Sequence, residues 1–170
     1  MNIDLASVGK VAKPIAAVFE PDEIDLKDEN AALKGKAEFT GETQQVDAKA
    51  HIRGKIIADL STGCTRCLEP VERHVDIVFD DVFVDAGEER RVEETEVSLE
   101  ELDESLVIGG KVDLVEVVRE QLLLAMPEQV FCNDDCKGLC PKCGANRNLI
   151  DCKCADDEID PRWAALKNLK

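Results

Sequence analysis

The chain has 170 residues, of which 44% are apolar and 34% are charged, and its formal net charge is −16 at pH 7. Such a charge opposes general nucleic-acid binding, because that binding draws its affinity from basic side chains that neutralise phosphates. The first residues lack a basic cluster followed by an apolar run, and the sequence has no stretch approaching the roughly 20 apolar residues of a membrane-spanning helix. We therefore expect a soluble, cytoplasmic protein with no membrane partner.

Residues 1–86 are predicted to form a β-rich domain. Four strands are expected, over residues 15–19, 35–41, 46–60 and 71–84. The first is assigned to a sheet edge, because Pro14 and Pro21 flank it and proline cannot donate to a central ladder. The last alternates apolar and polar side chains, which is typical of a strand with one buried face.

The rest of the chain is predicted to contain an acidic linker, one main helix and a small C-terminal module. Residues 87–111 are rich in acidic side chains without a persistent apolar period, which indicates an acidic linker. Residues 112–127 are expected to form a helix that packs on the sheet, since Asp113 and Glu116 have the spacing of a capping box. A last short helix is expected over residues 162–169. The predicted fold class is α+β: an antiparallel β-sheet or partial barrel packed by one main helix, with a small C-terminal module.

That module, residues 128–170, is predicted to be Cys-rich and zinc-binding. It contains six of the eight cysteines, at Cys132, Cys136, Cys140, Cys143, Cys152 and Cys154. Cys140-Pro-Lys-Cys143-Gly144 matches a zinc knuckle, a tight turn that brings two thiolates to one ion. The second pair of ligands is left open between Cys152 with Cys154 and Cys132 with Cys136, so four of the six are expected to bind the metal.

The chemical state of these thiols has three alternatives: structural zinc, disulfide or redox switching, and free thiols. Clustered cysteines in a reducing compartment are more typical of metal sites than of disulfides. Zinc also accepts four thiolates in a tetrahedron and folds short segments that lack apolar residues. Structural Zn²⁺ is therefore the favoured interpretation.

The other two cysteines, Cys64 and Cys67, lie in a predicted loop between two strands. They could supply half of a second metal site, form a redox-active pair, or belong to a turn held by its own hydrogen bonds. A lone C-x2-C supplies only two of the four ligands that zinc prefers. The spacing alone leaves these alternatives open.

A basic stripe is predicted on the strand over residues 46–60. Its members, at alternate positions and hence on one face, are Lys49, His51, Arg53 and Lys55. They could form a track for RNA phosphates. The favoured interpretation is a solvated strand face neutralised by the acids Glu72, Asp76 and Asp80 of the neighbouring strand. His51 and His74 are likewise assigned to solvent-facing positions.

Three segments taken together resemble a known family. They are Cys64-Thr-Arg-Cys67-Leu-Glu-Pro, the helix end Leu124-Ala-Met-Pro127, and Cys136-Lys-Gly-Leu-Cys-Pro-Lys-Cys-Gly-Ala-Asn146 followed by Asp160-Pro-Arg-Trp-Ala-Ala-Leu166. They are similar to the YceD or YlbN-type family, bacterial and plastid proteins named for large ribosomal RNA subunit accumulation. The resemblance implies a role in producing or maintaining 23S ribosomal RNA, without an established enzymatic activity.

We accordingly expect a non-enzymatic factor that supports assembly of the large ribosomal subunit. Two mechanisms are open: the acidic surface binds a basic ribosomal protein, or basic residues contact RNA in a pre-ribosomal particle. The first is favoured by the net charge. The second would use the stripe and four bases of the module, Lys137, Lys142, Arg147 and Lys153. The alternative class is a thiol-based, zinc-releasing redox sensor or chaperone.

Overall fold

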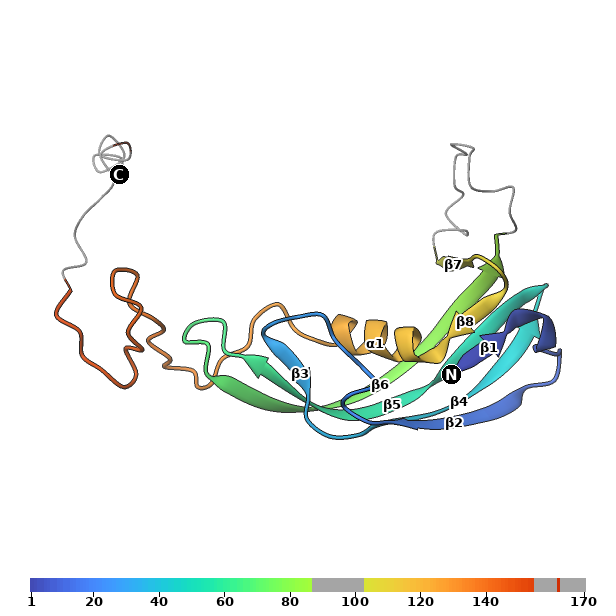
Figure 1. Ribbon diagram of the computed structural model, residues 1–170, viewed down its shortest axis with the longest axis horizontal. Coiled ribbons are helices and arrows are strands. Elements are labelled where there is room, and N and C mark those ends of the chain that lie inside the picture. Colours follow the sequence, from blue (N-terminus) through green and yellow to red (C-terminus); the bar gives the residue numbers. More distant parts are fainter. Residues whose placement is uncertain (87–102, 155–161, 163–170) are drawn as a thin grey trace.

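The computed structural model describes residues 1–86, 103–154 and 162 of the chain, and its main element is one curved sheet (Figure 1). The strands of this sheet are β2 (Lys13–Phe19), β3 (Ala31–Leu33), β4 (Ala37–Val46), β5 (Lys49–Gly63), β6 (Pro70–Asp85) and β7 (Glu104–Val107). They follow the order β2-β4-β5-β6-β7, with β3 paired to the far end of β5. All pairs are antiparallel except β6 with β7, which is parallel.

The predicted strands are confirmed with shifts at their ends. β2 lies at the edge of the sheet, as the flanking prolines indicated. β4 is longer than expected, because it continues through Gly41 to Val46. β5 begins at Lys49 because Asp47 and Ala48 form a two-residue hairpin turn, with φ of 49° and 65°. Positive φ at both central residues is typical of the turn type that matches strand twist.

One short strand lies within the residues that were expected to be a linker, and another spans the boundary between that linker and the predicted helix. β7 pairs with the end of β6, and β8 (Lys111–Asp113) pairs with the N-terminal β1 (Asn2–Asp4), which precedes a short 3₁₀ helix, η1 (Leu5–Ser7). The linker prediction is therefore wrong at these positions. The predicted helix over residues 162–169 lies outside the described residues apart from Arg162.

The main helix α1 (Leu114–Leu124) confirms the expected element with shorter ends. Asp113 caps it, since its carboxylate accepts a hydrogen bond of 3.1 Å from the Val115 N–H. Val112 belongs to β8 and not to the helix. Among the described residues, no helix has the length and apolar character needed to cross a membrane.

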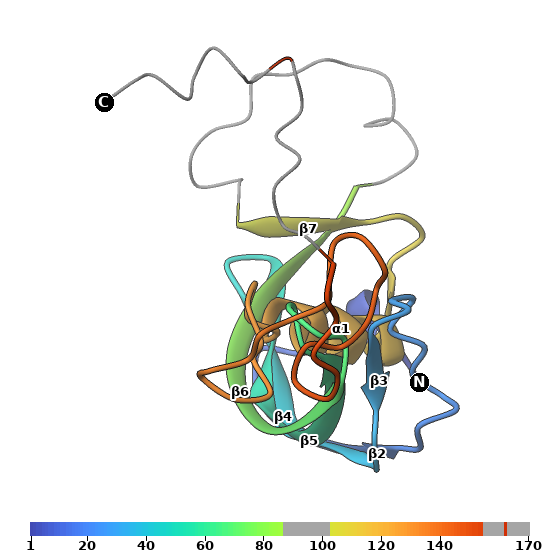
Figure 2. The same cartoon turned by 90° about the vertical axis from the view of Figure 1, so that its left-hand side faces the viewer.

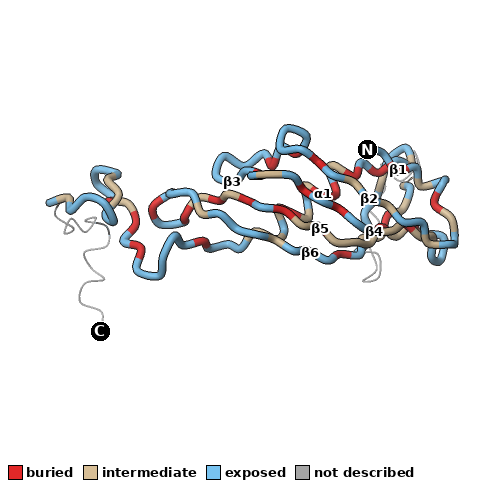
Figure 3. The backbone as a smooth tube through the Cα atoms, turned by 90° about the horizontal axis from the view of Figure 1, so that it is seen from below, coloured by how far each residue is buried: buried red, intermediate tan, exposed pale blue. Residues whose placement is uncertain are grey.

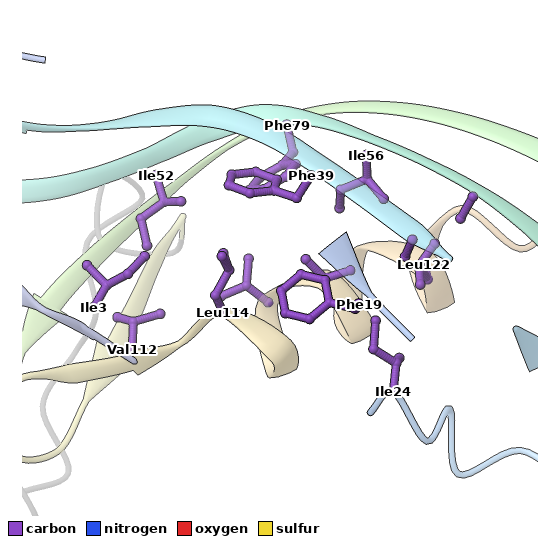
Figure 4. Close-up of a cluster of buried hydrophobic side chains, with 14 of the residues drawn as sticks. Ile3, Phe19, Ile24, Phe39, Ile52, Ile56, Phe79, Val112, Leu114 and Leu122 are labelled. Carbon is purple, nitrogen blue, oxygen red and sulfur yellow. The ribbon is translucent and has the colours of Figure 1, made fainter. Parts of the chain in front are cut away.

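The hydrophobic core lies between α1 and one face of the sheet (Figure 4). From the helix, Leu114, Val118 and Leu122 are fully buried. The strand residues that meet them include Phe39 and Ile56, which are also fully buried. Because α1 covers only this face, the strands present apolar side chains inward and charged side chains outward.

The β5–β6 hairpin extends beyond the core and carries a second buried region at its tip. The chain that follows α1 runs back to this tip and continues beyond it as residues 128–154 (Figures 1 and 2). A separate small cluster of buried residues lies there, formed by Cys64, Cys67 and Cys136 with Val71 and Leu139. Figure 3 shows buried stretches both at the hairpin tip and in the segment next to it. The cysteines thus sit apart from the main core.

Candidate metal centres

The eight cysteines gather into two groups of four. The first, here called the bridging cluster, consists of Cys64, Cys67, Cys132 and Cys136; the second, the terminal cluster, consists of Cys140, Cys143, Cys152 and Cys154. Within each group every sulfur lies within 4.8 Å of the others, and none of the eight cysteines forms a disulfide. Of the two pairings that the sequence left open for Cys140 and Cys143, the structure brings Cys152 and Cys154 to them. Cys132 and Cys136 instead meet Cys64 and Cys67.

The spacing of the sulfurs in the bridging cluster fits a tetrahedral metal site. The Sγ atoms of Cys64 and Cys136 are 3.8 Å apart, and those of Cys67 and Cys132 are 3.6 Å apart. A tetrahedron with zinc–sulfur bonds of about 2.3 Å has sulfur–sulfur edges of about 3.8 Å. These separations are too long for disulfides, which need about 2.05 Å. Either group could therefore hold a metal ion through four thiolates.

The tip of the β5–β6 hairpin positions the first two thiols. Cys64 follows directly after β5, and the Leu68 N–H donates to the Cys64 carbonyl at 2.9 Å, which closes the knuckle. Burial raises the pKa of the Cys64 thiol, but the backbone N–H groups of Arg66, Cys67 and Cys132 outweigh burial and lower this pKa to about 6. Hydrogen bonds to the thiolate favour the charged form, which is the form that binds metal.

The segment after α1 brings the other two thiols of the bridging cluster to the hairpin. The Val130 carbonyl accepts from both the N–H and the hydroxyl of Thr65, at 2.8 and 2.9 Å. The Leu139 N–H donates to the Arg66 carbonyl at 2.9 Å. Cys132 and Cys136 lie between these two attachment points, so backbone hydrogen bonds flank the cluster on both sides.

Arg66, inside the knuckle, holds the same segment with its side chain. Its guanidinium donates to the Cys136 carbonyl at 3.1 Å and lies 4.2 Å from the centroid of the Phe131 ring. Gly138 makes this approach feasible: its φ is +71°, and a Cβ there would lie 2.9 Å from the Arg66 carbonyl oxygen. The sequence did not predict these contacts of Arg66 and Gly138, because nothing in a C-x2-C pattern says which later segment its middle residues will contact.

The terminal cluster is built on the second knuckle. The Gly144 N–H donates to the Cys140 carbonyl at 2.8 Å, and the Cys140 N–H donates to the Ala145 carbonyl at 2.8 Å. Backbone N–H groups of Cys143 and Lys142 lower the pKa of the Cys140 thiol to about 6. The Cys143 thiol and burial raise the pKa of Cys154 to about 12. A metal must displace such protons, so its apparent affinity should rise with pH.

Asn148 connects the two clusters. Its side-chain carbonyl accepts from the Lys137 N–H at 2.8 Å, and its amide donates to the Cys136 sulfur at 3.3 Å. This hydrogen bond from Asn148 is the largest of the causes that lower the pKa of the Cys136 thiol. Asn148 lies in the loop between Cys143 and Cys152, so a loop of the terminal cluster stabilises a thiolate of the bridging cluster. The sequence offers no spacing rule that points to it.

Replacing Asn148 by Asp is expected to weaken metal binding at the bridging cluster by about tenfold or more. The variant keeps the acceptor for Lys137 but places a negative charge beside the Cys136 thiolate in place of a donor. Hydrogen-bond partners of metal ligands contribute about 10–100-fold to affinity. Stepwise release of zinc to a chelator would measure both clusters in one sample. Leu149→Asp, which adds the same charge at the neighbouring exposed residue, serves as the control; equal loss in both variants would contradict a specific contact.

The basic stripe is paired with acids along its whole length. The partners of Lys49, His51, Arg53 and Lys55 are Glu104, Asp80, Glu42 and Asp76, at 2.5, 3.1, 2.9 and 2.7 Å respectively. Asp76 and Asp80 were expected as partners; Glu72 instead lies 3.7 Å from Lys34. His74 pairs with Asp59 at 2.8 Å. A phosphate would have to compete with these carboxylates for each base.

The comparisons with known proteins agree with the resemblance seen in the motifs. The family model described as "Large ribosomal RNA subunit accumulation protein YceD" matches residues 52–170, a range that contains both clusters. An uncharacterized protein of Mycobacterium tuberculosis is 28% identical over 98% of this chain and 79% of its own length. The uncharacterized protein YlbN of Bacillus subtilis is 28% identical over 81% of this chain and 72% of its own.

A plant relative carries a more informative name. The chloroplastic "Large ribosomal RNA subunit accumulation protein YCED homolog 1" of Arabidopsis thaliana is 35% identical over 35% of this chain and 19% of its own length. No solved structure matches the chain significantly. Both descriptions name the accumulation of an RNA and not a reaction. Because the family model covers most of the chain and all eight cysteines, this protein belongs to the YceD family of large ribosomal RNA subunit accumulation proteins.

Proposed function

We propose that this protein is a non-enzymatic factor of the cytoplasm that supports assembly of the large ribosomal subunit, and so the accumulation of 23S ribosomal RNA. The observation that carries the proposal is the family match over residues 52–170. The two clusters agree with a binding role, because four thiolates fill the coordination sphere of zinc and leave no open position for a substrate.

In this proposal each cluster holds one Zn²⁺ ion, and the two ions have different tasks. The ion in the bridging cluster joins the β5–β6 hairpin to the segment after α1. The ion in the terminal cluster folds residues 140–154, where the described side chains supply little buried apolar surface. Structural zinc commonly replaces a hydrophobic core in such small modules.

The partner that the charges favour is a basic ribosomal protein within a pre-ribosomal particle. The net charge is −16, and the stripe bases are each within 3.1 Å of an acid. Three bases lie close in sequence to the thiolates: Arg66 of the hairpin tip and Lys142 and Lys153 of the module each stand between two cysteines. Since four thiolates around one zinc ion carry a net negative charge, these bases offset that charge and are less available to RNA.

The functional test is depletion of the protein from growing cells. We expect the ratio of 23S to 16S ribosomal RNA to fall and incomplete large subunits to accumulate, because a missing assembly factor leaves its RNA exposed to degradation. The wild-type chain should restore the ratio. An unchanged ratio, with normal subunit profiles on sucrose gradients, would refute the proposal.

A charge reversal in the stripe distinguishes binding of a basic ribosomal protein from direct contact with RNA. Arg53→Glu combined with Lys55→Glu should abolish rescue if the stripe contacts RNA phosphates, because such contacts depend on positive charge. We expect rescue to persist, since both bases are already paired with Glu42 and Asp76. If a variant that still folds and binds zinc fails to rescue, direct RNA contact by the stripe would replace binding of a ribosomal protein as the proposed mechanism.

A further inference from the structure

The two knuckles share one hydrogen-bond pattern but differ in the residue that follows the second cysteine. In the terminal cluster Gly144 follows the second cysteine, with φ of +70°, and its N–H donates to the Cys140 carbonyl. At the equivalent place in the bridging cluster stands Leu68, with φ of +63°, and its N–H donates to the Cys64 carbonyl. The turn requires a left-handed backbone at this position, and glycine is the residue that adopts it without cost.

Leu68 is therefore a strained residue. A left-handed backbone brings Cβ close to the following carbonyl oxygen, so bulky side chains rarely adopt it. Three other non-glycine residues have positive φ: Asp47 and Ala48 in the β4–β5 turn, and Lys27, whose N–H donates to the Asp25 carboxylate. Those are polar or small residues in turns. Leu68 is the bulky apolar one among the described residues.

Packing within the fold does not explain why a leucine occupies position 68. The residue is 60% exposed, so it adds little to the main core or to the small cluster around the cysteines. Leu68 lines a hollow of about 230 Å³ at the tip of the β5–β6 hairpin, next to β3. The hollow is lined by Glu29, Asn30, Ala31, Ala32, Ser61, Thr62, Gly63, Leu68 and Pro70. Strained residues that the fold does not need are more frequent at binding sites.

The charges near the hollow select the kind of partner. Glu29 lies in its wall, and Glu69 follows Leu68 in the chain. Glu72, on β6 beyond Pro70, lies 3.7 Å from Lys34, but its side chain is 77% exposed, so its carboxylate stays accessible to a partner. An apolar contact bordered by carboxylates is complementary to a polypeptide segment that presents an aliphatic or aromatic side chain among lysines and arginines.

We propose that Leu68 and the hollow beside it form the docking surface for a basic segment of a protein partner, with one apolar side chain of that segment seated against Leu68. The inference rests on the proposed function, because it identifies the partner as a cationic protein of the large ribosomal subunit. It adds the place of contact and a reason for retaining a strained leucine in the knuckle.

The test uses substitutions that keep the turn but remove the leucine side chain, so that an effect on partner binding can be distinguished from an effect on folding. Leu68→Gly and Leu68→Asn both suit a left-handed backbone, so each should keep two zinc ions per chain and resist chelator at least as well as the wild type. Each purified basic protein of the large subunit would be titrated separately by calorimetry. Both variants should bind at least about tenfold more weakly, since burying one leucine contributes roughly that factor or more.

Leu149→Asn is the matched control. Leu149 is 76% exposed, lies in the loop of the terminal cluster and does not line the hollow, so its loss removes an exposed leucine that is no part of the proposed contact. We expect its affinity for the partner to remain within about twofold of the wild type, as is usual for surface substitutions outside a contact.

The outcomes distinguish the contact from the function. Unchanged affinity of both Leu68 variants for a protein that the wild type binds would overturn the contact and leave the proposed function intact. Loss of zinc from Leu68→Gly would assign Leu68 a structural role and overturn the contact as well. Failure of the wild type to bind any cationic subunit protein would overturn both. Binding of a 23S RNA fragment that weakens in the Leu68 variants would show that the partner class is wrong.

Discussion

Protein purified under reducing conditions should contain two zinc ions per chain, and the double variant Cys64→Ser, Cys67→Ser should contain one. The reason is geometric: the four sulfurs of each cluster lie within 4.8 Å of one another, so each cluster has a complete ligand set. Removing two of four ligands leaves Cys132 and Cys136 without a site. Metal analysis by mass spectrometry gives the ratio directly. A ratio of one in the wild type would mean that only one cluster is a metal site.

The same variant is expected to release the segment after α1 from the hairpin. Binding of structural zinc contributes about 10–16 kcal/mol in small zinc-dependent peptides, far more than the hydrogen bonds from Thr65 to Val130 and from Leu139 to Arg66. Limited proteolysis should then cut residues 125–139, while α1 and the sheet stay protected, because their core does not include the cysteines of the tip. Protection of residues 125–139 equal to that of the wild type would contradict a stapling role.

The terminal cluster supplies the matched control for this experiment. The double variant Cys143→Ser, Cys154→Ser should also lose one of the two zinc ions, but it leaves the bridging cluster complete. Residues 140–154 should become sensitive to protease while residues 125–139 remain protected. If both double variants expose the same segment, the two clusters form one cooperative unit instead of two sites with separate tasks.

The strands could be predicted because their signal is local. Alternation with a period of two identifies β5 and β6 from side chains within each segment, and Asp113 marks the start of α1 in the same way. β7 could not be predicted so well, because residues 86–103 separate it from its partner β6 and its own four residues, Glu104–Val107, have no clear alternation.

The candidate site could be predicted in its residues but not in its grouping. Clustering and C-x2-C spacing identify the cysteines as candidate metal ligands from nearby residues alone. Which pair joins which knuckle depends on the long β5–β6 hairpin and on the chain that returns to its tip after α1 (Figure 1). Thus Cys132 joins Cys67, 65 residues away, and not Cys140, which is near in sequence. The contacts of Arg66 and Asn148 follow from that tertiary arrangement and have no local signature.

Replacing Gly41 by Ala is expected to lower the free energy of unfolding by about 3 kcal/mol or more. Gly41 on β4 is paired with Gly54 on β5, and the ring of the fully buried Phe39 packs against both. A Cβ at Gly41 would overlap the Arg53 carbonyl oxygen and lie 2.9 Å from the Gly54 Cα. These are backbone atoms of the central strands, so they cannot move aside as a flexible side chain would.

Substitution of Gly54 tests the same close approach from the other strand, and substitution of Gly35 is the control. A Cβ at Gly54 would lie 2.6 Å from the Phe39 ring and 2.7 Å from the Thr40 carbonyl oxygen, so Gly54→Ala should also be strongly destabilising. A Cβ at Gly35 would meet no atom within 4 Å, and Gly35→Ala should therefore change stability by less than about 1 kcal/mol. Urea denaturation of the zinc-loaded protein measures all three, with the midpoint as readout. Equal midpoints for Gly41→Ala and Gly35→Ala would show that the close approach of β4 and β5 does not limit stability, and that the glycine pair serves another purpose than the seating of Phe39.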